Sequence, residues 1–142
     1  MKKKLNCILL VDDDKATNFL HKKIIGNNDV SENILVALNG KEAMIIICNA
    51  LIDNDKNNTL PELVFLDINM PIMNGWEFME EYQKLDESKK SKIIIIMLTS
   101  SINTEDEIKA RKFPEISGFL NKPLKTEMLN NLLKEKFNFI KR

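Results

Sequence analysis

Short apolar runs alternate with longer segments of helical periodicity along the chain, and few folds accommodate that alternation. The apolar runs predict buried strands at residues 7–11, 34–38, 63–66, 93–98 and 118–120. The intervening periodicity predicts helices at residues 15–25, 41–52, 75–85, 104–113 and 125–140. Continuous apolar runs of this length are typical of strands covered on both faces, as in a parallel sheet. The order of segments therefore predicts a doubly wound α/β domain with right-handed crossovers.

The length and charge of the chain narrow its class further. Its 142 residues fit a single domain over 1–142, with a core expected from about 5 to 140. Lysine plus arginine and aspartate plus glutamate each number 21, which argues against direct DNA binding because such binding requires a basic excess. No stretch reaches the roughly 18 apolar residues of a membrane span. We therefore expect a cytoplasmic protein without membrane association.

The first helical segment carries an apolar face formed by Ala16, Phe19, Leu20 and Ile24. His21 is the only histidine of the chain, and it falls beside two lysines on the polar side of that helix. We therefore expect His21 to be an ordinary surface residue. A phosphorelay histidine on this helix is not predicted.

Reactive side chains follow four of the five predicted strands. In an open α/β sheet, functional groups gather where the strands end. The residues at these positions are Asp12-Asp13-Asp14, Asp67, Thr99-Ser100 and Lys122-Pro123. Clustered carboxylates repel one another, and a hard divalent cation offsets that repulsion. Together with a lysine and a hydroxyl, they supply the surroundings that a phosphoryl group needs, and a carboxylate can accept it as an aspartyl phosphate.

Four segments resemble the receiver domain of two-component response regulators. They are ILLVDDD at 8–14, LDINMPIMNG at 66–75, LTS at 98–100 and GFLNKP at 118–123. The segments follow one another in the family's order over nearly the whole chain. The resemblance implies a flavodoxin-like, five-stranded parallel sheet of order 2-1-3-4-5 with helices on both faces. It also implies a stand-alone, single-domain phosphoprotein of a two-component phosphorelay.

The resemblance assigns the phosphoryl group and the metal to particular residues. Asp67 would be the phosphoacceptor. Mg²⁺ or Mn²⁺ would be held by Asp13 directly, by Asp12 through water, by Asp67 and by the backbone carbonyl of Asn69. Asn69 and Ser101 would flank the phosphate and tune its hydrolysis.

The resemblance also assigns the contacts to the phosphoryl group and the switch. Thr99, Ser100 and Lys122 would contact the phosphoryl group, and the peptide bond before Pro123 would be cis. Thr99 and Phe119 would carry the switch. Phe119 lacks the hydroxyl of the tyrosine that is frequent at its position, so switching would rest on packing of the ring.

The resemblance implies partners as well. A sensor histidine kinase or phosphotransfer protein would donate the phosphoryl group. An unknown downstream protein would bind the face formed by residues 104–113, 118–120 and 125–140, or the phosphoryl group would be relayed onward. The apolar residues at 137–140 leave a homodimer open. The chain would not be an enzyme beyond its own phosphorylation and slow autodephosphorylation.

Other readings of the same residues remain. Asp14 is expected to cap a helix, and Trp76 to serve packing. Asn74-Gly75 is expected to form a turn that enters a helix, where glycine permits unusual backbone angles. A Mg²⁺-dependent phosphatase of the haloacid-dehalogenase kind would instead use Asp12 as its nucleophile. That alternative lacks a later acidic pair for its metal and leaves Asp67 without a role. A nucleotide binder would need a glycine-rich phosphate loop, which the sequence does not contain.

Overall fold

Five parallel strands form one sheet in the computed structural model, which describes residues 4–138 apart from 55, 57–59, 91–92 and 101–102. The order across the sheet is β2-β1-β3-β4-β5, which confirms the predicted doubly wound, flavodoxin-like topology. The strands are β1 Leu5–Val11, β2 Ser31–Ala37, β3 Leu63–Leu66, β4 Ile94–Thr99 and β5 Ile116–Asn121.

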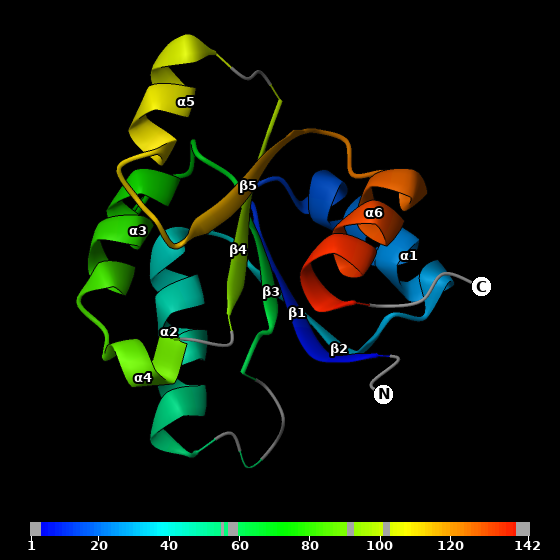
Figure 1. Ribbon diagram of the computed structural model, residues 1–142, viewed down its shortest axis with the longest axis horizontal. Coiled ribbons are helices and arrows are strands. Elements are labelled where there is room, and N and C mark those ends of the chain that lie inside the picture. The colour runs from blue at the N-terminus through cyan, green and yellow to red at the C-terminus, as the bar shows by residue number, and fades with distance from the viewer. Residues whose placement is uncertain (1–3, 55, 57–59, 91–92, 101–102, 139–142) are drawn as a thin grey trace.

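Helices cover both faces of the sheet (Figure 1). The helices are α1 Lys15–Asn28, α2 Gly40–Ile52, α3 Gly75–Gln83, α4 Glu87–Lys90, α5 Thr104–Ala110 and α6 Thr126–Phe137. Helices α2, α3, α4 and α5 lie on one side, and α1 and α6 lie together on the other (Figure 1). The short helix α4 was not predicted from the sequence.

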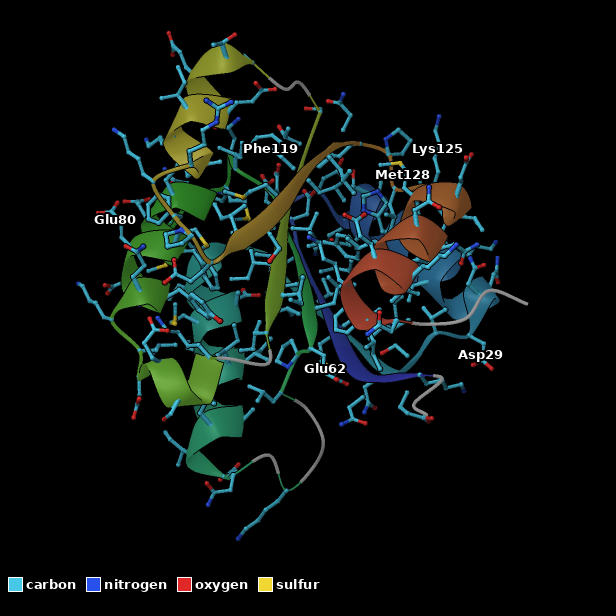
Figure 2. All side chains as sticks on the ribbon, in the orientation of Figure 1. Asp29, Glu62, Glu80, Phe119, Lys125 and Met128 are labelled. Atoms are coloured by element: carbon cyan, nitrogen blue, oxygen red, sulfur yellow. The ribbon has the colours of Figure 1, made fainter. Side chains whose placement is uncertain are left out.

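The sheet separates two hydrophobic cores, and Figure 2 shows side chains filling the space between the sheet and each helix layer. The α2–α3 core includes Leu9, Val11, Ile47, Leu66, Phe78 and Met79. The α1–α6 core includes Ile8, Leu10, Ile25, Leu98, Leu129 and Leu133. Successive residues of β1 enter opposite cores because side chains alternate along a strand. This double burial explains the continuous apolar runs in the sequence.

The register of the strands places their carboxyl ends side by side. Val11 of β1 pairs with Leu66 of β3, and Thr99 of β4 pairs with Asn121 of β5. The residues that follow these pairs therefore meet at one edge of the sheet, which is where the sequence predicts the functional groups.

Helix α1 is rotated about its axis relative to the prediction. Its buried residues are Asn18, His21 and Ile25, whereas Phe19 is 66% exposed and Leu20 is 55% exposed. The prediction of a buried Phe19 and Leu20 face and of a surface His21 was therefore wrong. The physical reason is hydrogen bonding, because the side chains of Asn18 and His21 pair with backbone groups near the edge of the sheet.

Several boundaries differ from the prediction by a few residues. Strand β2 begins at Ser31 because its polar start pairs with Leu5 at the edge of the sheet. Helix α5 ends at Ala110, and Phe113 instead stacks on Trp76 with 6.1 Å between ring centroids. Helix α6 ends at Phe137, because Asn138 adopts a left-handed conformation as its C-cap, so the prediction of a helix to 140 was wrong. No helix in the described part of the chain is long and apolar enough to cross a membrane.

Candidate functional site

Asp67 follows directly after the central strand β3, and its residue is only 8% exposed. Its backbone N–H donates to the carbonyl of Val11 at 2.9 Å, which ties its backbone to the end of β1. Burial raises the pKa of Asp67, the neighbouring carboxylate of Asp12 raises it further, and Lys122 acts in the opposite direction. Asp67 is thus a carboxylate held in a place where its charge needs compensation.

Three carboxylates gather at this edge of the sheet. Oxygens of Asp12, Asp13 and Asp67 all lie within 4.8 Å of one another. At 4.8 Å and an effective dielectric constant of about 20, the buried pair Asp12 and Asp67 repel by about 3.5 kcal/mol. Asp13 is exposed and gives the cluster access to solvent. A set of hard oxygen donors with this charge fits Mg²⁺ or Mn²⁺.

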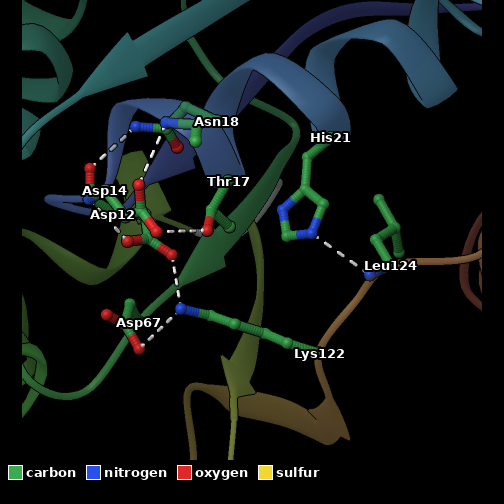
Figure 3. Close-up of polar contacts among 9 residues, drawn as sticks. Asp12, Asp14, Thr17, Asn18, His21, Asp67, Lys122 and Leu124 are labelled. Atoms are coloured by element: carbon green, nitrogen blue, oxygen red, sulfur yellow. Dashed lines mark hydrogen bonds and ion pairs between the residues drawn. The ribbon is translucent and has the colours of Figure 1, made fainter.

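Lys122 reaches into the same cluster from the loop after β5 (Figure 3). Its Nζ lies 2.5 Å from Oδ2 of Asp12 and 3.3 Å from Oδ1 of Asp67. Burial by itself lowers the pKa of Lys122, but the hydrogen bonds and charges of both aspartates outweigh burial and raise it. The ammonium is therefore kept charged between the two carboxylates. The peptide bond between Lys122 and Pro123 is cis.

The other described residues expected at the site stand at or after the ends of β4 and β3. Thr99 is buried at the end of β4, and its carbonyl accepts the backbone N–H of Lys122 at 2.7 Å. Ser100 and Asn69 are exposed in the loops after β4 and β3. Ser101 lies outside the described residues.

Phe119 lies on β5 beside α5 (Figure 2). Its ring is half-buried and packs against the α2–α3 core. It also lines an open cavity of about 380 Å³ between α5 and β5, together with Arg111 and Pro114. A side chain at this position has room to change its packing.

The residues expected to serve structure do so. Asp14 caps α1 by accepting from the backbone N–H of Ala16 at 3.0 Å and from the hydroxyl of Thr17 at 2.9 Å. The hydrogen bond from Thr17 is the main cause that lowers the pKa of Asp14, and the bond from Ala16 adds to it. Asp14 therefore serves the helix and is separate from the carboxylate cluster.

Helix α3 begins with a capping box, in which Asn74 and Glu77 each accept the other's backbone N–H. Trp76 is buried, as expected for a packing residue. The reason for Gly75 differs from the prediction, because none of the glycines has a positive φ. A Cβ at position 75 would instead lie 2.5 Å from the carbonyl oxygen of Asp67. Gly75 is required by close approach.

Sequence reasoning missed two residues next to the site. The amide of Asn18 donates to the carbonyl of Asp12 at 2.8 Å, and the ring of His21 accepts the backbone N–H of Leu124 at 3.2 Å (Figure 3). Asn18, His21 and Ile25 are spaced by three and four residues, which places them on one face of a helix. This spacing was the signal in the sequence that could have identified the buried face. The apolar residues Phe19 and Leu20 instead indicated a different buried face.

Comparisons with known proteins agree with this geometry. Residues 8–134 match the family model of the response regulator receiver domain. The probable transcriptional regulator ycf29 of Porphyra purpurea is 33% identical over 129 residues, which cover 91% of this chain and 54% of that protein. Response regulator Rcp1 of Synechocystis is 29% identical over 101 residues, which cover 71% of this chain and 66% of that protein. The matches thus span between about half and two thirds of these relatives.

A solved structure and further relatives extend the comparison. The crystal structure of a two-component response regulator from Cytophaga hutchinsonii has a TM-score of 0.84 at 31% identity, covering 95% of this chain and 98% of that one. Histidine kinases of Dictyostelium discoideum and Helicobacter pylori contain matching segments as well. Nothing in these comparisons supports the phosphatase alternative based on Asp12. The chain therefore belongs to the response regulator receiver domain family, whose members are phosphoacceptor switches of two-component signalling.

Proposed function

We propose that Asp67 is the residue that accepts the phosphoryl group in this receiver domain. The observation that carries the proposal is its position at the end of the central strand, within 4.8 Å of two further carboxylates and 3.3 Å from the ammonium of Lys122. Asp12 is also buried and lies near the same lysine, but both of its carboxylate oxygens are already engaged. Asp12 is already held by Lys122 at 2.5 Å and by the backbone N–H of Asp14 at 2.9 Å.

The cluster is proposed to hold Mg²⁺ or Mn²⁺, with Asp13, Asp67 and the backbone carbonyl of Asn69 as ligands and Asp12 acting through water. The support is the donor set, which is all oxygen and carries three negative charges against one lysine. When bound, such an ion neutralises charge on the transferring phosphoryl oxygens. The exposed Asp13 offers the route by which an ion enters from solvent.

In the transfer step, an oxygen of Asp67 attacks the phosphorus of a phosphohistidine on a partner kinase or phosphotransfer protein. An O–P bond forms, the N–P bond breaks, and the imidazole leaves with the bonding electron pair. Lys122 is proposed to stabilise the negative oxygens of the phosphoryl group, and Thr99 to donate its hydroxyl to one of them. Ser100 is exposed directly after Thr99, and its small side chain is proposed to admit the donor.

The output is proposed to be a change in protein contacts. Thr99 would move toward the new phosphoryl group, and Phe119 would repack because it borders an open cavity. Both residues adjoin the face formed by α5, β5 and α6, where a downstream protein would bind. Homodimer formation and onward relay of the phosphoryl group are the other outputs consistent with the family. Beyond its own phosphorylation and slow autodephosphorylation, the domain would act by binding.

Acetyl phosphate with Mg²⁺, followed by intact mass measurement, tests the acceptor directly. We expect a single phosphoryl adduct in the wild type and none in Asp67→Asn. Asp14→Asn is the matched control, because asparagine also caps helices well and Asp14 lies outside the cluster. An adduct that survives in Asp67→Asn, or one that maps to Asp12, would refute the assignment.

A further inference from the structure

His21 lies on the inner face of α1 and is 3% exposed. Its Nε2 accepts the backbone N–H of Leu124 at 3.2 Å (Figure 3). A ring nitrogen that accepts carries no proton, so the ring is neutral and its proton is on Nδ1. Burial lowers the pKa of His21 and thereby favours this neutral form, although the charge of Asp12 acts in the opposite direction. The side chain is therefore kept as a hydrogen-bond acceptor.

The partner of His21 belongs to the segment that carries Lys122. The backbone N–H of Lys122 donates to the carbonyl of Thr99 at 2.7 Å, and two residues later Leu124 donates to His21. Leu124 is fully buried in the α1–α6 core. The segment is thus attached to β4 on one side and to α1 on the other, and these two attachments set the backbone from which the lysine side chain extends.

The same face of α1 also holds the partner of Lys122. The amide of Asn18 donates to the carbonyl of Asp12 at 2.8 Å, one helical turn before His21. Asn18, His21, Asp12 and Asp67 all line one cavity of about 10 Å³, which is room for about one water molecule. Helix α1 therefore contacts both partners of the ion pair between Lys122 and Asp12. Asn18 binds the backbone of Asp12, and His21 binds the backbone two residues after Lys122.

We propose that His21 is a positioning residue for phosphoryl transfer, which fixes through Leu124 the backbone from which Lys122 reaches the phosphoryl group. The inference rests on the proposed function for the role of Lys122. A purely space-filling role would explain why His21 is buried. It would not explain why Nε2 of His21 accepts a hydrogen bond from the backbone N–H of Leu124. Loss of the acceptor would leave the N–H of Leu124 buried and unpaired, and the segment would shift to find another partner.

Two substitutions at position 21 separate positioning from packing. His21→Leu fills the space but offers no acceptor, whereas His21→Gln places an amide oxygen near the position of Nε2. We expect His21→Leu to lower the rate of phosphorylation by acetyl phosphate about fivefold, the effect of losing one hydrogen bond of ordinary strength. We expect His21→Gln to stay within about twofold of the wild type.

Affinities for two ligands provide a second readout. His21→Leu should weaken binding of beryllofluoride, a phosphoryl mimic that contacts Lys122, by about fivefold as well. It should leave the Kd for Mg²⁺ within about twofold, because the carboxylates stay in place. Ile25→Val is the matched control, since Ile25 is buried on the same helix face and its truncation costs stability without removing the acceptor of the Leu124 N–H. Equal rates in His21→Leu and the wild type, or equal losses in His21→Leu and His21→Gln, would overturn the proposal.

Nuclear magnetic resonance tests the hydrogen bond without any phosphoryl chemistry. In ¹⁵N-labelled wild type we expect a scalar coupling between the amide nitrogen of Leu124 and Nε2 of His21. The side-chain ammonium signal of Lys122 should shift in His21→Leu and return toward the wild-type position in His21→Gln. An unshifted Lys122 signal in His21→Leu refutes positioning even if phosphorylation fails. A wild type that shows the coupling but takes no phosphoryl group refutes the proposed function instead.

Discussion

Gly75 begins α3 directly against the backbone of the proposed phosphoacceptor, so a single methyl group at this position acts on the site. A Cβ there would lie 2.5 Å from the carbonyl oxygen of Asp67 and 3.0 Å from Cα of Ile68, and ordinary contact begins at 3.4 Å. The oxygen and the helix would therefore have to separate by about 0.9 Å, the difference between 3.4 and 2.5 Å. The hydrogen bond from the N–H of Gly75 to the carbonyl of Ile68, at 2.8 Å, opposes that separation.

The expected size of the effect follows from this displacement. Overpacking of a tight contact costs about 1–3 kcal/mol, so Gly75→Ala should lower the free energy of unfolding by about 2 kcal/mol. A misplacement of about 1 Å at a reacting group can cost about 100-fold in rate. If α3 and β3 share the displacement equally, Asp67 moves by about half of it, and we expect phosphorylation to slow about tenfold.

Urea denaturation followed by circular dichroism measures the first effect, and the rate of adduct formation with acetyl phosphate measures the second. Gly26→Ala is the matched control because a Cβ at this exposed helical position meets nothing within 4 Å. It should stabilise the protein by about 0.5–1 kcal/mol and leave the rate unchanged. A Gly75→Ala variant with wild-type stability and wild-type rate would refute the close-approach argument.

Three further predictions concern the charges of the site. Because the pKa of Asp67 is raised in the folded state, the folded protein binds a proton more tightly than the unfolded chain, and stability falls as pH rises through the raised pKa. Asp67→Asn should therefore be more stable than the wild type at neutral pH, by about 1–2 kcal/mol, and urea titrations should show this advantage shrinking as pH is lowered. Lys122→Met should lose about 3 kcal/mol in Mg²⁺-free buffer, because it leaves two buried carboxylates without their cation, and calorimetry should show a lower Tm. Mg²⁺ at about 100 times its Kd should stabilise the wild type by about 2.7 kcal/mol and raise its Tm, and EDTA should reverse the increase in Tm. Asp13→Asn should need a higher Mg²⁺ concentration to reach the same Tm.

The sequence was sufficient for the sheet and for the residues that directly follow its strands. Apolar runs identify parallel strands, and Asp67, Thr99 and Lys122 each come at or just after the end of a strand. Because strand ends in a parallel sheet share an edge, their convergence required no knowledge of side-chain packing. The placement of Asp12 beside Asp67 followed from the same rule.

The rotation of α1 was not predicted, because apolar residues of this helix are exposed and polar residues are buried. Phe19 and Leu20 face outward, while Asn18 and His21 face inward to satisfy backbone groups. A hydrophobic pattern reports which residues avoid water and says nothing of hydrogen-bond partners that come from distant segments. The partner of His21 is 103 residues away in the sequence.

Lys90 is a second buried polar residue with an interaction partner that is distant in the sequence. It is 4% exposed on α4, a helix that was not predicted. Its Nζ approaches the carboxylates of Glu87 at 3.3 Å and Glu115 at 3.5 Å, and it lies 5.2 Å from the centroid of the Tyr82 ring. Burial of a lysine requires such compensation, and Glu115 comes from another part of the chain.

The division of the interior into two cores has a consequence for how such a domain can diverge. Lys122 is supported through Leu124 in the α1–α6 core, whereas Phe119 packs against the α2–α3 core on the other side of the sheet. On the proposed output face, substitutions around Phe119 and α5 would therefore alter which partner is recognised while the packing behind the lysine stays the same. We expect lineages of this fold to vary the residues around Phe119 and α5 faster than those behind Lys122, because these two groups of residues pack on opposite sides of the sheet.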